Sequence, residues 1–407
     1  MKSASTTEPT TPSPTPTPSE PVVVPVDPPV IPSASPSAGP VGPDGSGYVA
    51  LSSPVRVMDS RNGTGTPMEQ KVGQVPLDLS SVIPEGASAA VLNITTAGVT
   101  QPGYLVVYAD EPSGGGTSNQ NLVPGEIRAN EVVAALPASR RLVVHVRSAE
   151  PVDLIADLVG YFSPDTGGQL DVRTPTRVFD SRKTSNPLRS GETVVDLSDH
   201  VPDGASTVVL NVTTTGAAGP GFVVAYPTGT SKPRTSNVNF ARGLTVANEA
   251  FVRLGTSSDD GHVTFVVNGA PSVLVVDLWA VVVGEDSDGL VLDTIAPTRA
   301  LDTRYGIGTS VGRRFGRVTV PLPESVPATA KAVVMTVTIT GTAGQGYVTA
   351  FPSGDAPLAS ALNFSPGATK SNQVVVGVGP DRTVQLLIVG SDSPQSHVIA
   401  DVLAVLE

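Results

Sequence analysis

After residue 46, the chain consists of short apolar segments separated by turn residues. Residues 208–214 read Val-Val-Leu-Asn-Val-Thr-Thr, and the alternation of apolar and polar side chains within them predicts a strand that packs one of its faces on a core. Other segments, such as 152–162, are apolar on both faces and are expected to be central strands. Valine, threonine and isoleucine fill the segments, and Gly, Pro, Asn and Asp separate them. The pattern predicts an all-β protein made of antiparallel, jelly-roll-like β-sandwiches.

A polar signature divides the chain into three copies of one unit. It reads Pro, Arg, Asp, a hydroxyl residue and Arg, and its first arginines, Arg56, Arg177 and Arg299, lie 121 and 122 residues apart. A solenoid is disfavoured because its units are much shorter. We expect three sandwich domains at 47–163, 168–284 and 289–407, each large enough to bury a core of its own. The sequence does not indicate whether they pack together.

Residues 1–46 form a segment of different composition. They contain 13 of the 39 prolines, interleaved with Thr and Ser. Such a segment cannot bury a core, so it is expected to be a disordered, extended stalk, or an ordinary disordered tail. Met1 and Lys2 lead into Ser3 without the apolar core of a signal peptide. Either the protein stays inside the cell or an export segment has been removed, and the stalk favours an extracellular or cell-surface location.

Composition excludes several functions. The net charge of −12 argues against nucleic acid as a partner, because a basic surface is needed to neutralise phosphates. No run of about 18 apolar residues is present, so no membrane insertion is expected. Cysteine is absent and the four histidines show no zinc spacing, so we expect no metal and no cofactor. Residues 308–312 match a nucleophile-elbow pattern, but in one copy only and without the strand–helix context, so no enzyme is expected.

Each copy ends in an apolar segment, its closing strand, and the aspartate within that strand is the clearest local signal. Asp157, Asp277 and Asp401 interrupt apolar runs, and a buried carboxylate needs a partner. The signature arginines are the cations that recur with them, so Asp157 is expected to meet Arg56 or Arg61. The complete predicted set is Arg56, Asp59, Arg61, Asp157, Arg177, Asp180, Arg182, Asp277, Arg299, Asp302, Arg304 and Asp401. This set could form a ligand pocket. It could also be a structural staple, by which we mean Arg–Asp pairs that fix the register of neighbouring strands, and this second interpretation is favoured.

A second set of recurring residues is a candidate ligand site. Amides combined with an aromatic face could hold a sugar, although buried asparagines also satisfy loop backbone groups and aromatic residues also fill cores. The candidates are Asn119, Asn121, Asn130, Asn237, Asn239, Asn248, Tyr108 and Tyr226. Trp279 lies in a closing strand and is expected in the core.

Together these motifs resemble a known family. The signature, the Asn-Val-Thr strand, the Ser-Asn-x-Asn segments at 118–121 and 236–239 and the closing Ala/Val-Asp-Leu runs are similar to an extracellular β-repeat of actinobacteria. That repeat occurs in secreted cell-wall hydrolases and in tandem surface proteins. The resemblance covers residues 49–407. The third copy departs from the pattern at Thr336 and Ala361, where the others have asparagine, so any site built on these amides should bind worse there.

The resemblance and the repeat imply a non-enzymatic surface protein. Three linked copies would bind a cell-envelope polysaccharide or a surface protein with raised avidity, in adhesion or anchoring. Two alternatives remain open, namely a structural spacer or self-assembling subunit and an accessory region of an enzyme. The oligomeric state is not predicted.

Overall fold

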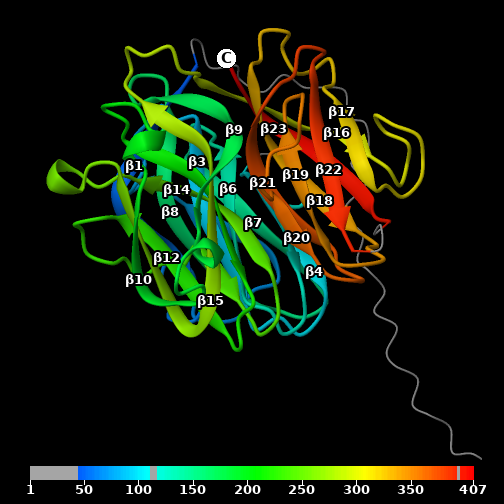
Figure 1. Cartoon of the computed structure of the whole chain (residues 1–407), viewed down its shortest axis with the longest axis horizontal. Coiled ribbons are helices and arrows are strands. Elements are labelled where there is room, and N and C mark those ends of the chain that lie inside the picture. Colours follow the sequence, from blue (N-terminus) through cyan, green and yellow to red (C-terminus); the bar gives the residue numbers. More distant parts are fainter. Residues whose placement is uncertain (1–44, 111–116, 392–394) are drawn as a thin grey trace, which may run out of the picture.

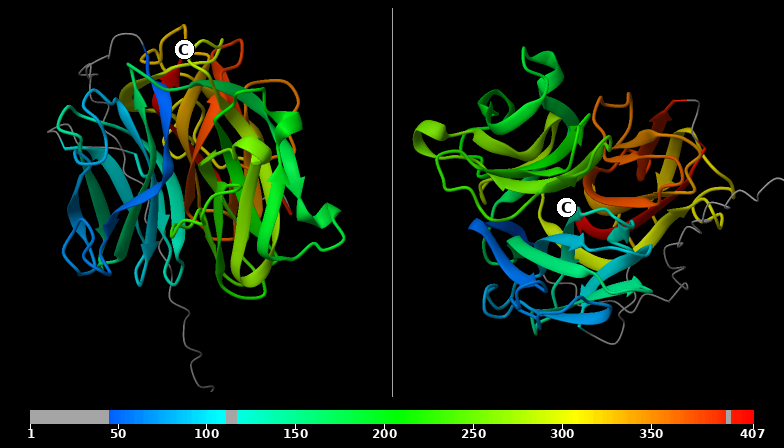
Figure 2. Two further views of the ribbon diagram at one scale, coloured as in Figure 1. Left: turned by 90° about the vertical axis from the view of Figure 1, so that its left-hand side faces the viewer. Right: turned by 90° about the horizontal axis from the view of Figure 1, so that it is seen from below.

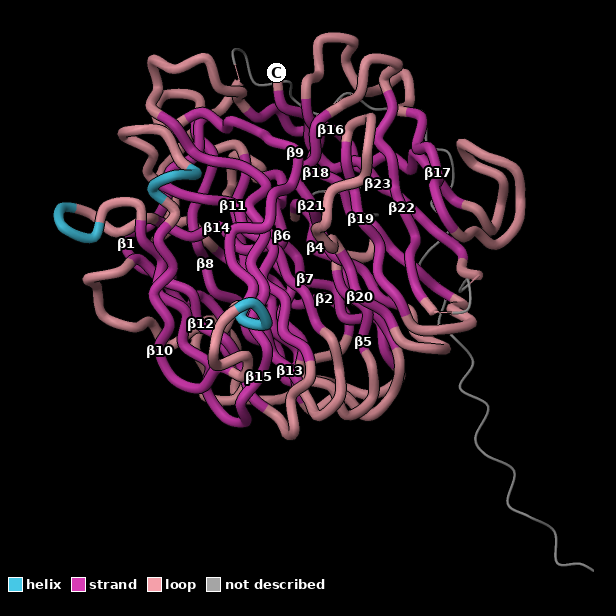
Figure 3. Tube along the Cα trace, viewed as in Figure 1, coloured by secondary structure: helices cyan, strands magenta, loops and turns pink. Residues whose placement is uncertain are grey.

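Strands make up nearly all of the regular structure. The computed structural model describes residues 45–110, 117–391 and 395–407 (Figure 1). Within them, helical structure is limited to the 3-10 turns η1 (Ser181–Lys183), η2 (Ser198–His200) and η3 (Ser257–Asp259) (Figure 3). None of these is long or apolar enough to cross a membrane. The predicted all-β class is confirmed. The stalk predicted at 1–46 lies outside the described residues except for residues 45 and 46.

Each copy folds into two packed antiparallel sheets. In the first domain the inner sheet has the order β1-β8-β3-β6 and the outer sheet has the order β2-β7-β4-β5. The strands are β1 (Gly47–Asp59), β2 (Gly73–Asp78), β3 (Ala89–Ala97), β4 (Gly103–Ala109), β5 (Gln120–Leu122), β6 (Arg128–Ala135), β7 (Arg141–Ser148) and β8 (Asp153–Ser163).

The second domain repeats this plan with one difference. Its strand β15 is long enough to serve in both sheets, so the inner order β9-β15-β11-β14 and the outer order β10-β15-β12-β13 share a strand. The strands are β9 (Gln169–Asp180), β10 (Arg189–Asp196), β11 (Thr207–Thr215), β12 (Gly221–Pro227), β13 (Val238–Phe240), β14 (Val246–Arg253) and β15 (His262–Val283).

The third domain returns to the plan of the first. Its inner sheet has the order β16-β23-β18-β21, and its outer sheet has the order β17-β22-β19-β20. The strands are β16 (Leu292–Asp302), β17 (Gly316–Pro321), β18 (Ala332–Thr340), β19 (Gly346–Phe351), β20 (Leu362–Phe364), β21 (Lys370–Gly377), β22 (Thr383–Gly390) and β23 (His397–Leu406).

The two sheets of a domain differ in burial. Outer strands such as β2 and β17 alternate buried and exposed residues, because one face is on the core and the other in water. Every residue of the inner strands β3 and β18 is buried, so both faces of the inner sheet are covered. The closing strands were predicted to be central, and the structure shows what covers their second face: a neighbouring domain.

The three domains pack side by side around a common axis. Seen from below, the blue–cyan, green and orange–red domains form a ring of three lobes (Figure 2). Isolated β-bridges connect the start of each domain to another: Ser46 with Leu292, Tyr48 with Gly168, and Leu170 with Leu290. Each bridge has two backbone hydrogen bonds, 2.7–3.0 Å long. Tyr48, Leu170 and Leu292 occupy equivalent positions, so the bridges form a closed cycle.

The cores of the domains merge at this axis. One cluster of buried apolar residues includes Tyr48 and Phe162 from the first domain, Phe251 and Trp279 from the second, and most of the third. Tyr48 packs on Phe162 and Phe251 at ring-centroid distances of 5.3 and 4.9 Å. Trp279 is fully buried, as expected. The sequence suggested that each unit buries a core of its own, whereas the structure joins part of the three cores into one.

Candidate functional site

Each buried aspartate of a closing strand is paired with the first arginine of its signature. Arg56 donates to both carboxylate oxygens of Asp157, from Nε at 2.8 Å and from Nη2 at 3.1 Å. The same bidentate hydrogen bonding joins Arg177 to Asp277 and Arg299 to Asp401, and the bond from Nε is again 2.8 Å long. Of the two partners expected for Asp157, the structure selects Arg56. Two parallel bonds to one carboxylate fix both side chains.

The remaining signature residues form the turn that follows. Arg61 donates to both oxygens of Asp59 from Nε and Nη2, at 2.9 and 2.8 Å, and Arg182 and Arg304 bind Asp180 and Asp302 in the same way. The hydroxyl residue between them accepts a bond from the closing strand. Ser60, Ser181 and Thr303 accept from the backbone amides of Leu154, Leu274 and Val398 at 2.9–3.0 Å.

The carboxyl groups of the two sets differ in their pKa. Burial raises the pKa of Asp157, Asp277 and Asp401 above the usual value, while the arginine bond opposes this effect. The pKa of Asp59 and Asp180 is lowered, mainly by the bonds from Arg61 and Arg182. The aspartates of the closing strands therefore depend on their arginines to remain charged.

The Arg–Asp pair begins a polar row that crosses the whole inner sheet. Arg56 lies opposite Asp157 in the strand register, Asp157 opposite Asn93, and Asn93 opposite Glu131. Residues directly opposite each other on adjacent strands project from the same face of a sheet. The second domain has the row Arg177, Asp277, Asn211, Glu249, and the third has Arg299, Asp401, Thr336, Gln373. Each row faces a neighbouring domain.

The middle of the row binds the next domain directly. The Nδ2 of Asn93 donates to the carbonyl oxygen of Ser236 at 2.7 Å, and Asn211 makes the equivalent bond to the carbonyl oxygen of Ser360. The hydroxyl of Thr336, in the third row, is buried and has no hydrogen-bond partner among the described residues. The third junction instead places Lys370 and Arg128 each 3.8 Å from Glu126.

At the axis, the last residues of the rows form a second cycle between domains. Glu131 accepts from the backbone amide of Phe251 at 3.2 Å, and Glu249 accepts from that of Val375 at 2.9 Å. Gln373 completes the cycle by accepting from the amide of Val133 in the first domain. Every domain thus uses this side chain to hold the edge strand of another domain's inner sheet, namely β14, β21 or β6.

The two glutamates are held in an environment that favours their neutral form. Both are buried, and burial raises the pKa of Glu131 and Glu249 to about 8. Glutamine, which is a neutral analogue of protonated glutamate, stands at the third position. Neither acid was among the residues predicted from the sequence, although each is a carboxylate within an apolar strand, as Asp157 is, and follows Asn130 or Asn248.

Several asparagines proposed as ligand residues bond to the backbone. Asn119 and Asn237 accept from the amides of Val107 and Ala225 at 2.7 and 2.8 Å. Asn130 and Asn248 donate to the carbonyl oxygens of Asn119 and Asn237 at 2.6 and 2.7 Å. The bonds of Asn119 and Asn237 lie along the outer sheet, and those of Asn130 and Asn248 connect the inner sheet to it.

The other two asparagines differ from this pattern. Asn239 accepts from the hydroxyl of Ser236 at 3.0 Å. Asn121 is buried, and neither atom of its amide has a partner among the described residues.

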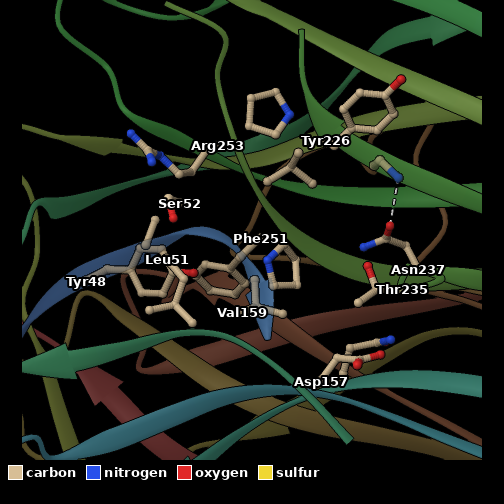
Figure 4. A pocket seen from close by; sticks show the side chains of 16 residues that line it. Tyr48, Leu51, Ser52, Asp157, Val159, Tyr226, Thr235, Asn237, Phe251 and Arg253 are labelled. Atoms are coloured by element: carbon tan, nitrogen blue, oxygen red, sulfur yellow. Dashed lines mark hydrogen bonds between the residues drawn. The ribbon is translucent and has the colours of Figure 1, made fainter. Parts of the chain in front are cut away.

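The proposed aromatic candidates do not form one platform. Tyr108 lies on the first domain, where its hydroxyl is 3.2 Å from Nδ1 of His145. Phe351, the matching aromatic of the third domain, is fully buried. Tyr226 is also buried, but it lines a groove between the first and second domains (Figure 4).

This groove brings Tyr226 and Asn237 together with residues of the first domain. The groove has a volume of about 30 Å³, which is room for about two water molecules, and one side of it opens to solvent. Arg253 lies at one end and Asp157 at the other, and the amide nitrogen of Asn237 points toward the middle (Figure 4). The other lining residues are Tyr48, Ala50, Leu51, Ser52, Pro54, Asn93, Val159, Ala225, Pro227, Thr235, Phe251 and Val252.

The described residues include no group of three or more His, Asp or Glu side chains that could hold a metal ion.

Comparison with known proteins adds little. No family model and no curated protein matches the chain. Two matching structures come from archaeal viruses. The structure of Sulfolobus Turreted Icosahedral Virus has 9% identity and a TM-score of 0.18, and the triple jelly roll of an archaeal virus turret has 8% identity and a TM-score of 0.17. Each match covers 88% of this chain and 90% of the other chain. A tandem of CBM22 domains from Paenibacillus barcinonensis Xyn10C has 10% identity, a TM-score of 0.17, and coverage of 63% of this chain and all of its own. Scores this low carry no argument about function.

Proposed function

We propose that this chain is a non-enzymatic cell-surface protein that binds a cell-envelope polysaccharide or a protein partner. The binding part is the ring of the three domains at 47–163, 168–284 and 289–407, which we call the head. The observation that carries the proposal is the groove between the first and second domains, where the candidate residues Tyr226 and Asn237 lie together beside Arg253. An aromatic side chain, an amide and a cation at one partly open site are the groups that recognise polar ligands.

The structure changes how multivalency applies to this proposal. The repeated polar residues are occupied in bonds within and between the domains, so they do not supply three equal ligand sites. The residues that differ between the copies, such as Arg253, are free to give each junction its own specificity. We therefore propose one or more distinct sites on a single head rather than three identical sites.

The test is binding of the full chain to isolated cell walls and to an array of envelope glycans and surface proteins. Binding that is lost on heat denaturation supports the proposal. If the native chain binds none of these materials, the proposal is wrong.

A structural subunit that self-associates is the second candidate, and one observation favours it. The turn after the third signature exposes the apolar side chains Tyr305, Val311 and Phe315, with exposed fractions of 50%, 67% and 40%. Exposed apolar residues that are near each other mark contact surfaces. Sedimentation velocity of the full chain separates the candidates: a concentration-dependent rise in mass supports self-assembly, and a monomer at all concentrations contradicts it.

A further inference from the structure

A loop of the third domain gathers exposed apolar side chains. Twelve large apolar side chains are exposed in the described part of the chain, and four of them lie between residues 305 and 315. These four are Tyr305, Ile307, Val311 and Phe315. The loop folds back on itself, because the backbone amide of Gly312 donates to the carbonyl oxygen of Thr303 at 2.8 Å. One compact loop therefore presents an apolar surface to solvent, which is typical of a contact site.

The same loop is basic in a chain that is acidic overall. Residues 303–317 contain four arginines and no acid, whereas the whole chain has a net charge of −12. Arg304 is paired with Asp302, but Arg313 is exposed and has no ion pair within the described residues. Arg314 donates to the hydroxyl of Ser310 at 2.9 Å, which leaves its charge without an acid. We call residues 303–317 the basic loop.

The second domain carries the opposite charge on two segments that adjoin each other. Residues 192–203 contain four acids and residues 256–262 contain two, and neither segment contains a lysine or an arginine. The segments meet where the backbone amide of Leu197 donates to the carbonyl oxygen of Gly261 at 2.9 Å. We call these two segments the acidic surface.

The acidic surface is open to a partner, and it lies away from the basic loop. Asp199 and Asp260 are exposed, and Val194 adds an exposed apolar side chain. The acidic surface begins on β10, and the basic loop runs into β17. Figure 1 shows these two strands at opposite sides of the head. The two surfaces of one chain therefore do not meet each other.

We propose that copies of this chain bind one another head to tail, with the basic loop of one copy on the acidic surface of the next. The inference rests on the second candidate function, self-assembly, and names the partner surface. Complementary charges fix the orientation of such a contact, and the exposed apolar side chains on both surfaces lose their water when it forms. Each bound copy still has one free surface, so association continues into a chain of copies unless it closes into a ring.

Sedimentation velocity of the full chain at two salt concentrations tests the contact. At about 0.05 M salt we expect the mass to rise with protein concentration, and at about 0.5 M salt we expect association at least about tenfold weaker, because salt screens exposed charges. Equal association at both salt concentrations overturns the inference.

Charge reversal tests the two surfaces separately. Arg313→Glu, and the double variant Asp199→Arg, Asp260→Arg, should each weaken self-association at least about tenfold, because like charges then face each other. Arg147→Glu and Glu150→Arg reverse exposed charges of the first domain and should leave association unchanged. Thermal melts verify that all variants fold, as expected for exposed positions. A control variant that loses association as Arg313→Glu does overturns the inference.

A mixture of the two kinds of variant tests the pairing itself. Arg313→Glu keeps its acidic surface, and the double variant of Asp199 and Asp260 keeps its basic loop. An equimolar mixture should therefore associate although neither variant does so alone. A mixture that stays monomeric overturns the inference.

The outcomes separate this inference from the function on which it rests. If the wild-type chain is a monomer at all concentrations, self-assembly and the head-to-tail contact both fail. If the wild-type chain associates but the association is insensitive to salt and to Arg313→Glu, self-assembly stands and the head-to-tail contact is wrong.

Discussion

Glu131 in the first domain accepts a hydrogen bond from the backbone amide of Phe251 in the second, with its Oε1 3.2 Å from the nitrogen. Both residues are buried, and the bond belongs to the cycle that Glu249 and Gln373 complete at the axis. The junction of the domains thus depends on two acids that are away from water. Their protonation should therefore control how firmly the head holds together.

The stability of the head should fall as the pH rises from 5 to 8. Burial raises the pKa of Glu131 and Glu249 to about 8, whereas a glutamate in an unfolded chain has a pKa of about 4.3. The folded state binds more protons between these values, so the stabilising contribution is complete below the lower pKa and is lost as the pH passes the upper one. We expect the free energy of unfolding, from urea titrations, to fall by about 3 kcal/mol per carboxyl.

The double variant Glu131→Gln, Glu249→Gln is the matched control, because the third domain already has Gln373 at this position. It should show a flatter pH profile and be more stable than the wild type at pH 8. A wild-type profile without slope between pH 5 and 8 would contradict the buried neutral carboxyls.

Removing one partner of a buried Arg–Asp pair should destabilise the protein strongly. Asp277→Asn leaves Arg177 without its counter-charge, and the expected cost is about 3–5 kcal/mol in the free energy of unfolding. Asp78→Asn, which breaks the exposed pair with Arg141, should cost less than about 1 kcal/mol. An unchanged melting temperature for Asp277→Asn would rule out the staple.

The second and third polar rows should respond differently to mutation of their middle residue. Asn211→Ala removes the donor to the carbonyl oxygen of Ser360 and should cost about 1–3 kcal/mol, because the carbonyl remains buried. Thr336→Val removes a hydroxyl without a partner among the described residues and should be neutral or stabilising. Thermal melts of both variants check this, and a larger loss for Thr336→Val would show that its hydroxyl has a role not seen here.

A single domain should not behave as a monomer. When residues 47–163 are expressed alone, water reaches the face of β3 and β6 that points away from the domain's own core. In the whole chain the neighbouring domains cover this face. We expect trimers or aggregates in sedimentation velocity. A cooperative, monomeric domain of native stability would show that the cycle at the axis contributes little.

Much of the fold could be predicted from the sequence because its signals are local or repeated. The turn residues and the constant spacing of Arg56, Arg177 and Arg299 indicated three sandwiches. The alternation at 208–214 predicted a strand with one face on a core, whereas that strand is the inner strand β11, in which both faces are buried. The pairing of Asp157 followed from electrostatics, since a buried carboxylate needs a cation and few recurred. What covers the second face of an inner strand could not be predicted, because an apolar residue looks the same whether it faces its own core or another domain.

The candidate site was harder to predict for a related reason. Tyr226 and Asn237 were identified, but Arg253 and the first-domain residues of the groove join them only when the structure places the two domains against each other. Residues this far apart along the chain have no link within the sequence pattern.

The closed cycle of bridges from Ser46 to Leu292, Gly168 to Tyr48 and Leu290 to Leu170 also restricts how such a gene can change in length. With three units every bridging edge has a partner, so a fourth copy inserted in tandem would find no free edge and would leave its inner sheet in water. A duplication of one unit should therefore be selected against, whereas a duplication of all three could form a second head. In the closed ring of three, each unit supplies one bridging edge and receives another.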